Sequence, residues 1–166
     1  MVDKKELFDT EYDLNKIHIE KFVKPVELWT VRVVLEDGAY MPEKAHEADA
    51  GFDLRTPKKF TLFPFMRKHI DTGVHVLLPA ELVGRVSPKS GLAKKYGIDT
   101  DGVVDGEYTG TIGVTILNRG WRIKRFRKGD KIAQLVISEN PRVDFIVSED
   151  IPDTERGDNG FGSTGR

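Results

Sequence analysis

The sequence predicts a small all-β protein, either a closed barrel or a two-sheet jelly roll. Short apolar runs recur along the chain, several of them alternate with a period of two, and Gly, Pro, Asn or Asp separates one run from the next. Alternation of this kind is typical of strands that are buried on one face. Many short strands with turn residues between them indicate a barrel or a sandwich.

The apolar runs and one further segment define the expected elements. The predicted strands are Trp29–Val33, Lys59–Phe63, His69–Leu77, Leu82–Val86, Val103–Val104, Thr111–Leu117, Ile132–Ile137 and Val143–Val147. One short helix is expected at Ser90–Tyr96, because Ser90 can serve as its N-cap and Gly97 can end it.

The chain divides into three parts by composition. Its 166 residues suffice for one domain with a hydrophobic core, and we expect a barrel over residues 29–150. Residues 1–28 are rich in charge and lack a clean helical period, so they are an N-terminal appendage of unknown role. Residues 151–166 are rich in glycine and cannot bury enough apolar area to fold alone. They are either a frayed terminus or a flexible arm that closes over a ligand.

Charge balance and cysteine content argue against several functions. The chain has 26 basic and 27 acidic residues, whereas nucleic-acid-binding proteins usually carry a basic excess. We expect no nucleic-acid partner and interpret the basic run at 122–128 as a solvated face, with a local basic patch as the alternative. Without cysteine there is no disulfide, thiolate nucleophile or Cys-based zinc site. No apolar stretch resembles a signal peptide or a membrane span, so we expect no membrane association and a cytoplasmic location.

Several familiar catalytic motifs fail on their context. Residues 160–165 match the dinucleotide-binding glycine pattern, but that pattern needs a strand before it and a helix after it. No glycine-rich loop leads into Lys-Ser or Lys-Thr, the four histidines lack metal-ligand spacing, and no serine lies in a nucleophile elbow. Covalent catalysis is therefore poorly supported.

The remaining chemistry lies in clusters of Gly, Asp, Ser and cationic residues. These clusters are Asp49–Leu54, Ser87–Ala93, Gly102–Gly110 and the glycine-rich tail. Asp105 directly follows an apolar strand, and partial burial there would suit it to take a proton from water. Lys89 and Ser90, at the helix start, would present a cation, a hydroxyl and backbone N–H groups to an anion.

These clusters, together with Gly129–Leu135, resemble in order the five motifs of the trimeric dUTP diphosphatases (dUTPases). The resemblance extends from about Trp29 to Arg166. It implies a jelly-roll-like, distorted β-barrel that forms a homotrimer, with the C-terminal arm exchanged between subunits and active sites at the interfaces. It further implies hydrolysis of dUTP to dUMP and pyrophosphate, which supplies dUMP and keeps uracil out of DNA.

The resemblance also implies roles for residues of the hairpin. Asp105 would be the catalytic base that orients the water attacking the α-phosphorus. Val103 and Val104 would lie in the hairpin whose backbone recognises uracil. Tyr108 would pack against the deoxyribose, and Gly113 would keep the backbone close to the ligand.

Phosphate and metal binding are implied for three other motifs. Lys89, Ser90, Gly91 and Gln134 would contact the phosphates, and Asp53 would reach Mg²⁺ through water. Lys89 departs from the family, which usually has Arg there; Lys keeps the charge and loses the bidentate fork. Residues 96–101 are fewer than in many members, so which of Asp99–Asp101 contacts uracil stays open.

The tail supplies the last motif. By resemblance, Arg156, Gly162, Ser163 and Thr164 would bind the γ-phosphate, and Phe161 would stack on the uracil ring.

Two alternatives remain. A dCTP deaminase-like enzyme of the same fold would need a catalytic Glu where this chain has Thr115. A non-catalytic, nucleotide-binding regulatory protein would tolerate a degenerate site, but Asp105, Tyr108, Arg156 and Phe161 are all intact.

Overall fold

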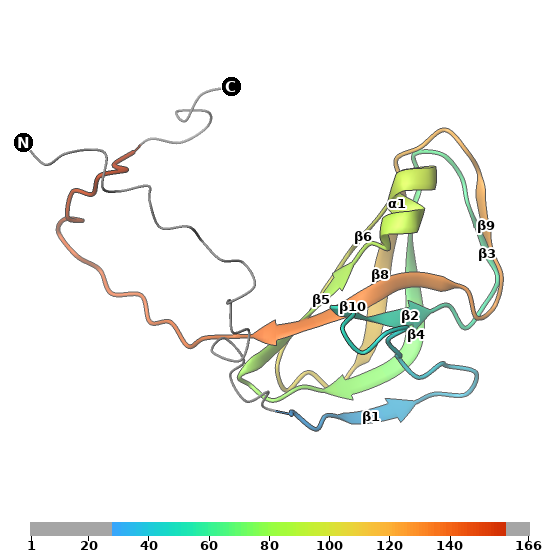
Figure 1. Cartoon of the computed structure of the whole chain (residues 1–166), viewed down its shortest axis with the longest axis horizontal. Helices are drawn as coiled ribbons and strands as arrows, with labels where there is room; N and C mark the ends of the chain where they lie inside the picture. Colours follow the sequence, from blue (N-terminus) through green and yellow to red (C-terminus); the bar gives the residue numbers. More distant parts are fainter. Residues whose placement is uncertain (1–27, 159–166) are drawn as a thin grey trace, which may run out of the picture. The chain divides into compact units, whose positions relative to one another are not determined.

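The computed structural model describes residues 28–158, so the N-terminal appendage up to residue 27 and arm residues 159–166 lie outside it. The division into appendage, barrel and arm therefore stays a prediction. The described elements are β1 (Arg32–Leu35), β2 (Gly51–Arg55), β3 (Phe60–Leu62), β4 (Arg67–Leu77), β5 (Leu82–Ser87), α1 (Ser90–Tyr96), β6 (Ile98–Asp101), β7 (Val103–Val104), β8 (Thr111–Asn118), β9 (Lys124–Phe126) and β10 (Lys131–Glu139), as labelled in Figure 1.

Two four-stranded antiparallel sheets form the body of the barrel, in the orders β1-β4-β8-β6 and β2-β10-β5-β7, and β3 pairs with β9 in a small third sheet. Strand β8 shows the predicted period of two, because Ile112, Val114 and Ile116 are buried and alternate with more exposed residues. Residues from both large sheets make up the core. Over residues 28–158 the prediction of an all-β fold with one short helix is confirmed.

The chain crosses from one large sheet to the other beside the core. Strand β6 is an edge strand of one sheet, and Gly102 connects it to β7, which is an edge strand of the other sheet. The carbonyl of Gly102 accepts a 2.8 Å hydrogen bond from the Val86 N–H. A Cβ at Gly102 would lie 3.1 Å from Val86 Cγ2, so glycine allows this close crossing. The segment after β7 then returns the chain to the first sheet as β8.

The helix occupies the predicted residues, but its cap differs. Lys89, with φ −78° and ψ 125°, is the N-cap, and its carbonyl accepts hydrogen bonds from the Leu92 and Ala93 N–H groups. The prediction of Ser90 as N-cap is therefore wrong by one residue, since Ser90 is already helical. Gly97 ends the helix in the left-handed conformation at φ 67°, as expected.

Strand boundaries differ from the predictions in two ways. Strands β2, β6 and β9 were not predicted, because each carries polar or charged residues that hide the alternation. The first strand begins at Arg32 and not at Trp29. The strand predicted at Val143–Val147 is wrong: the segment forms no ladder, and Phe145 is 97% exposed. A strand needs a paired neighbour, and the described part of this chain offers none there.

Asn118 joins three segments at the end of β8. Its side chain is fully buried, and its Nδ2 donates to the carbonyls of Leu62 at 3.3 Å and Arg122 at 2.9 Å. Its Oδ1 accepts a 3.0 Å bond from the Gly120 N–H. One buried amide thus ties β8 to β3 and to the turn before β9.

Replacing Asn118 by Ala should lower the free energy of unfolding by about 2–3 kcal/mol, because one buried and two partly buried backbone groups lose their partner. Urea denaturation at matched protein concentration measures the change. Asn140→Ala is the control, since the contact of that exposed side chain within residues 28–158 is a single 3.4 Å bond to the Ala80 carbonyl; it should change stability by less than about 0.5 kcal/mol. Equal effects of the two variants would contradict the assigned role.

Candidate active site

Strand β10 gathers the predicted phosphate-binding residues because it pairs with β2 on one side and with β5 on the other. Gln134 lies opposite Asp53 of β2 and opposite Ser87 of β5. The side chain of Gln134 donates a 3.2 Å hydrogen bond to the carbonyl of Pro88. The register thereby places Lys89, two residues beyond β5, next to Asp53.

Asp53 is the centre of this cluster. Lys89 Nζ forms an ion pair with its Oδ1, and Lys131 Nζ lies 2.5 Å from its Oδ2. Burial would raise the pKa of Asp53, but the hydrogen bonds and positive charges of Lys131 and Lys89 outweigh it and hold the pKa below its ordinary value of 3.8. The carboxylate is therefore ionised at neutral pH, and the three side chains together carry one net positive charge.

Both lysines keep part of their surface in solvent. The exposed fraction is 27% for Lys89, 36% for Lys131 and 7% for Asp53. An ammonium group has three N–H donors, so each lysine retains donors beyond its bond to the carboxylate. The cluster can therefore bind an anion while the buried carboxylate holds the two cations in place.

Sequence reasoning missed Lys131. It belongs to the same motif as Gln134, and the signal that could have identified it is a cation at the start of a strand whose later residue was already assigned to the phosphates.

Ser90 and Gly91 continue from Lys89 as the first residues of α1, and both are exposed. No atom lies within 4 Å of the position that a Cβ on Gly91 would take. The packing of this chain therefore does not require glycine here, and the space in front of the helix start is open. The structure brings Asp53, Lys89, Ser90, Gly91 and Gln134 into one region.

Asp105 begins the segment Asp105–Gly110 between β7 and β8. From here on we call this segment the hairpin; Val103 and Val104, which the resemblance also assigns to a hairpin, form β7 itself. Asp105 is exposed, so the expected burial is not supplied by this chain. The Glu107 N–H donates a 2.8 Å bond to the carbonyl of Leu78. A Cβ on Gly106 would lie 2.7 Å from the Pro79 carbonyl oxygen. The first half of the hairpin is thus packed against the turn before β5.

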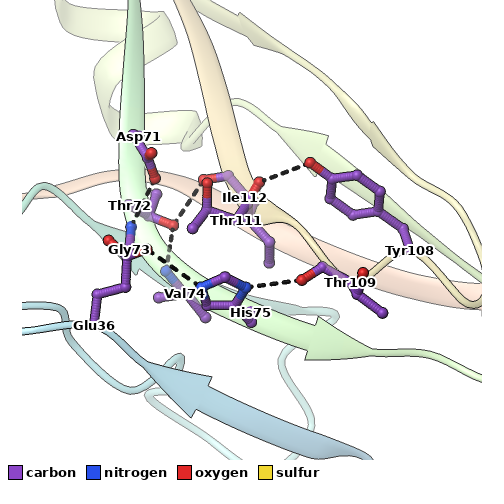
Figure 2. Close-up of polar contacts among 10 residues, drawn as sticks. All are labelled: Glu36, Asp71, Thr72, Gly73, Val74, His75, Tyr108, Thr109, Thr111 and Ile112. Atoms are coloured by element: carbon purple, nitrogen blue, oxygen red, sulfur yellow. Dashed lines mark hydrogen bonds and ion pairs between the residues drawn. The ribbon is translucent and has the colours of Figure 1, made fainter.

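Tyr108 lies across the second half of the hairpin, as Figure 2 shows. Its hydroxyl donates a 3.3 Å bond to the carbonyl of Thr111. A Cβ on Gly110 would come within 2.2 Å of that hydroxyl, so only glycine accommodates the ring in this position. The ring remains 46% exposed and is available to a ligand.

The hairpin and the lysine cluster lie at different ends of β5. Val104 pairs with Gly84, whereas Gln134 pairs with Ser87. Three residues along a strand span about 10 Å, and Asp105 lies beyond Gly84 in the direction away from Lys89. A single chain therefore does not bring the expected base to the expected phosphate-binding residues.

Three further predicted site residues, Val103, Val104 and Gly113, lie in the strands on either side of the hairpin. Val104 is buried and Val103 is 56% exposed. A Cβ on Gly113 would lie 2.3 Å from Cε1 of His69, so a larger residue here would have to displace the exposed imidazole of the neighbouring strand. Close approach of a ligand to Gly113 stays a prediction.

The arm is described only in part. Arg156 lies in the exposed segment 151–158, which contains no strand or helix. Phe161, Gly162, Ser163 and Thr164 lie outside the described residues.

The described residues contain no group of three or more His, Cys, Asp and Glu side chains that could hold a metal ion. Asp53 alone offers a carboxylate within the cluster, and both of its oxygens contact lysines. Mg²⁺ commonly keeps several waters and binds through one or two carboxylates plus substrate phosphates. A single carboxylate, Asp53, therefore suits a Mg²⁺ ion whose other ligands are water and the phosphates of a bound nucleotide. It does not suit an ion enclosed by protein ligands alone. Over residues 28–158, no helix is long and apolar enough to cross a membrane.

The fold and the cluster define an all-β protein with a partly exposed cationic cluster that could bind an anion. A family model described as dUTPase matches residues 37–165. The deoxyuridine 5'-triphosphate nucleotidohydrolase of Clostridium novyi is 43% identical over 132 residues, which cover 76% of this chain and 92% of that protein. The chain belongs to the dUTPase family.

Solved structures agree with this assignment. The dUTPase of Staphylococcus bacteriophage 80alpha matches with a TM-score of 0.78 and 29% identity, over 82% of this chain and 99% of that one. A mutant dUTPase from phage phi11 of S. aureus matches with a TM-score of 0.69 and 26% identity, over 75% and 99%. The jelly-roll-like barrel inferred from the motifs is confirmed.

Replacing Asp53 by Asn should lower the free energy of unfolding by about 1–2 kcal/mol, because two neighbouring lysines lose their common counter-charge in a partly buried position. Thermal denaturation at pH 7 measures the change. Asp99→Asn is the control, since the 2.8 Å ion pair of Asp99 with Arg119 is exposed; it should cost less than about 0.5 kcal/mol. If the two variants are equally stable, the buried cluster does not contribute as described.

Proposed function

We propose that the protein hydrolyses dUTP to dUMP and pyrophosphate in the cytoplasm, as a homotrimer whose active sites are shared between chains. Membership of the dUTPase family supports the activity, and so do relatives named as deoxyuridine 5'-triphosphate nucleotidohydrolases. The observation that carries the proposal is the cationic cluster around Asp53, with Lys89, Ser90 and Gln134 in one region.

The cluster serves the triphosphate. Lys89 and the start of α1 supply a cation, a hydroxyl and N–H groups to phosphate oxygens, and Gln134 supplies an amide. Lys131 adds a second ammonium on the far side of Asp53. Electrostatic neutralisation of this kind lets a nucleophile approach a highly charged phosphate.

Asp105 carries the chemical step. Its carboxylate accepts a proton from a water molecule, the water oxygen attacks the α-phosphorus in line, and the bond to the bridging oxygen breaks so that pyrophosphate leaves. Asp105 is exposed in the single chain, so a neighbouring chain and the nucleotide together would have to enclose it. General-base catalysis is typically worth about 10²–10⁴-fold in rate.

The nucleoside is bound by the hairpin side of the site. Backbone groups of Val103 and Val104 recognise the uracil edge, because a mismatched base would leave an amide unpaired in a dry pocket. The exposed ring of Tyr108 packs against the deoxyribose and excludes a 2′-hydroxyl. Gly113 keeps the backbone of β8 near the ligand.

Mg²⁺ is the proposed cofactor. The phi11 structure is described as showing a structural Mg(II) ion, and the 80alpha structure contains dUpNHpp. Asp53 would hold the ion through water, since its own oxygens are engaged by Lys89 and Lys131. When bound to the triphosphate, the cation supplies charge neutralisation.

Shared sites would account for three features of the single chain. Asp105 lies about 10 Å or more along β5 from the lysine cluster, and Gly91 faces open space. Residues 143–147 expose Val143, Phe145, Ile146 and Val147 to between 66% and 104%. An exposed apolar segment of this kind marks an interaction surface, and exchange between subunits would bury it. The arm would then close the site with Arg156, Phe161 and the residues from Gly162 to Thr164.

The deaminase alternative is not favoured. Thr115 occupies the position where that activity needs a Glu, and its hydroxyl lies 3.3 Å from His69 Nδ1. A hydroxyl cannot serve as the carboxylate base of that reaction.

Asp105→Asn should lower kcat for dUTP by about 10²–10⁴-fold, because the amide cannot accept the proton, while nucleotide binding largely survives. Pyrophosphate release from dUTP, dCTP, dTTP and UTP, with and without Mg²⁺, measures activity and specificity. The exposed Asp37→Asn substitution is the control. Unchanged turnover in Asp105→Asn would remove Asp105 from the role, and no release from dUTP by the unaltered protein would overturn the proposal.

Mixed oligomers test the sharing of sites between chains. Asp105→Asn and Lys89→Met should each be poorly active alone, whereas co-expression should restore about a quarter of the sites, because random trimers then join an intact hairpin to an intact cluster. As a control, Asp105→Asn is co-expressed with a chain that carries both substitutions. No activity should be restored, because neither chain then has Asp105. Mixed trimers without recovered activity would show that each site belongs to one chain.

A further inference from the structure

A bulge in β4 turns the end of this strand toward the hairpin. Asp71 pairs with Gly113 and His75 with Thr111, so three residues of β4 face the single residue Ile112 of β8. The bulge is held by the Asp71 carboxylate, which accepts a 2.9 Å bond from the Gly73 N–H. Bulges commonly re-aim side chains near active sites.

The bulge is well fixed by further bonds (Figure 2). The Thr72 hydroxyl donates a 2.7 Å bond to the Ile112 carbonyl and accepts a 3.3 Å bond from the Val74 N–H. Gly73 has φ +67°, which favours glycine, and its carbonyl accepts a 2.8 Å bond from the Glu36 N–H. The position of the strand beyond the bulge is therefore determined by several independent contacts.

The imidazole of His75 joins the hairpin to the turn after β1. Its Nδ1 lies 2.8 Å from the carbonyl oxygen of Thr109, and its Nε2 lies 3.4 Å from Glu36 Oε1. A carbonyl and a carboxylate are both acceptors, so both ring nitrogens should donate. Neutral imidazole has only one N–H, and only the imidazolium has two. The contacts therefore suit the protonated ring.

The surroundings of His75 favour the same form. The hydrogen bond to Thr109 raises the pKa of His75 above its ordinary 6.5; burial opposes this rise, and the hydrogen bond to Glu36 and the charges of Glu36 and Asp71 add to it. The neighbours across β1 and β8 in the register are Val34 and Thr111, which carry no charge. The stabilisation that the protonated His75 ring gains from Thr109 and Glu36 is thus fully present below about pH 6.5. It declines as the pH rises through the elevated pKa of His75.

Thr109 lies next to Tyr108 in the hairpin. The first half of the hairpin is held by the Glu107 N–H bond to Leu78, whereas His75 holds the second half through the Thr109 carbonyl. Without His75, the described contacts of this half are the Tyr108 hydroxyl bond to Thr111 and a 3.3 Å bond from the Tyr108 N–H to Asp105. The bond from His75 is thus the shortest of the three described hydrogen bonds that hold the Tyr108 half of the hairpin.

We propose that His75, paired with Glu36, is a positioning residue that holds the Tyr108 half of the hairpin in place for the nucleoside. The inference rests on the proposed function, since it takes the hairpin as the nucleoside-binding element. His75 does not touch the reacting atoms; it acts through Thr109 and Tyr108. Because Asp105 belongs to the separately anchored half, substrate binding should respond more than the chemical step.

Steady-state kinetics with dUTP between pH 5.5 and 9 test this role. His75→Ala should raise KM by about three- to tenfold at pH 6 through loss of a charge-assisted bond, with kcat changed less than about twofold. His75→Gln can still donate to the Thr109 carbonyl, so its KM should lie close to that of the unaltered protein. For the unaltered protein KM should rise with pH, and in His75→Gln this rise should be absent. The exposed His46→Gln substitution is the matched control. An unchanged KM in His75→Ala, or a pH dependence that persists in His75→Gln, would overturn the role.

A second measurement needs neither nucleotide nor activity. NMR titration of the histidine rings should give His75 a pKa above 6.5, and Glu36→Gln should lower it. Amide hydrogen exchange at residues 108–110 should become faster in His75→Ala than in His46→Gln. If the titration and exchange behave as described but dUTP is not hydrolysed, the proposed function fails and the contact stands. If exchange at residues 108–110 is unaffected, the positioning role fails even when the enzyme is active.

Discussion

The pairing of β5 with β10 is the constraint on which the site depends. Strand β10 pairs with β2 on its other side, so one register places Asp53, Ser87 and Gln134 side by side. The same strand β5 pairs with β7 near its other end, and this determines where Asp105 emerges. A slip of one residue would invert the faces of the strand and separate Lys89 from Asp53. The positions of the Asp53 cluster and of Asp105, the two halves of the proposed site, are therefore a consequence of strand register.

The electrostatics of the cluster follow from this geometry. A carboxylate that is 7% exposed needs counter-charge, and two lysines provide it from β10 and from the N-cap of α1. Lysine is a compact point charge on a flexible stem, unlike the rigid fork of arginine. Each lysine can therefore contact a different oxygen of Asp53 and still offer donors outward. The buried carboxylate orders two cations that would otherwise repel each other.

The hairpin is held in position before any ligand binds. The turn at 78–80 supports its first half, and the bulge of β4 brings His75 against its second half. Ordering a flexible loop on binding would cost conformational entropy, and these contacts remove part of that cost in advance. The hydrogen bonds at the bulge and at the Thr109 carbonyl thus support the segment that carries Tyr108.

Most of the fold could be predicted from local patterns. Strands such as β8 and β5 alternate clearly, and the helix with its Gly97 stop has strong local signals. Strands β2 and β9 could not be predicted in this way, because their stability comes from pairing with β10 and β3, which are distant in sequence. The prediction for residues 143–147 was wrong for the opposite reason. Their local pattern is that of a strand, but a strand also needs a neighbour to pair with, and the local pattern cannot provide one.

The sequence by itself determined the all-β class, the helix and the order of the motifs, because these depend on local periodicity and on residue types at fixed spacing. Its resemblance to the dUTPase motifs also singled out Asp53, Lys89 and Gln134 as predicted site residues, although not their mutual contacts. Only the tertiary structure decided that Lys131 shares Asp53, that Asp105 lies apart from this cluster, and that His75 faces Thr109. These relations arise from strand register and from a bulge, which bring together side chains that are far apart in the chain.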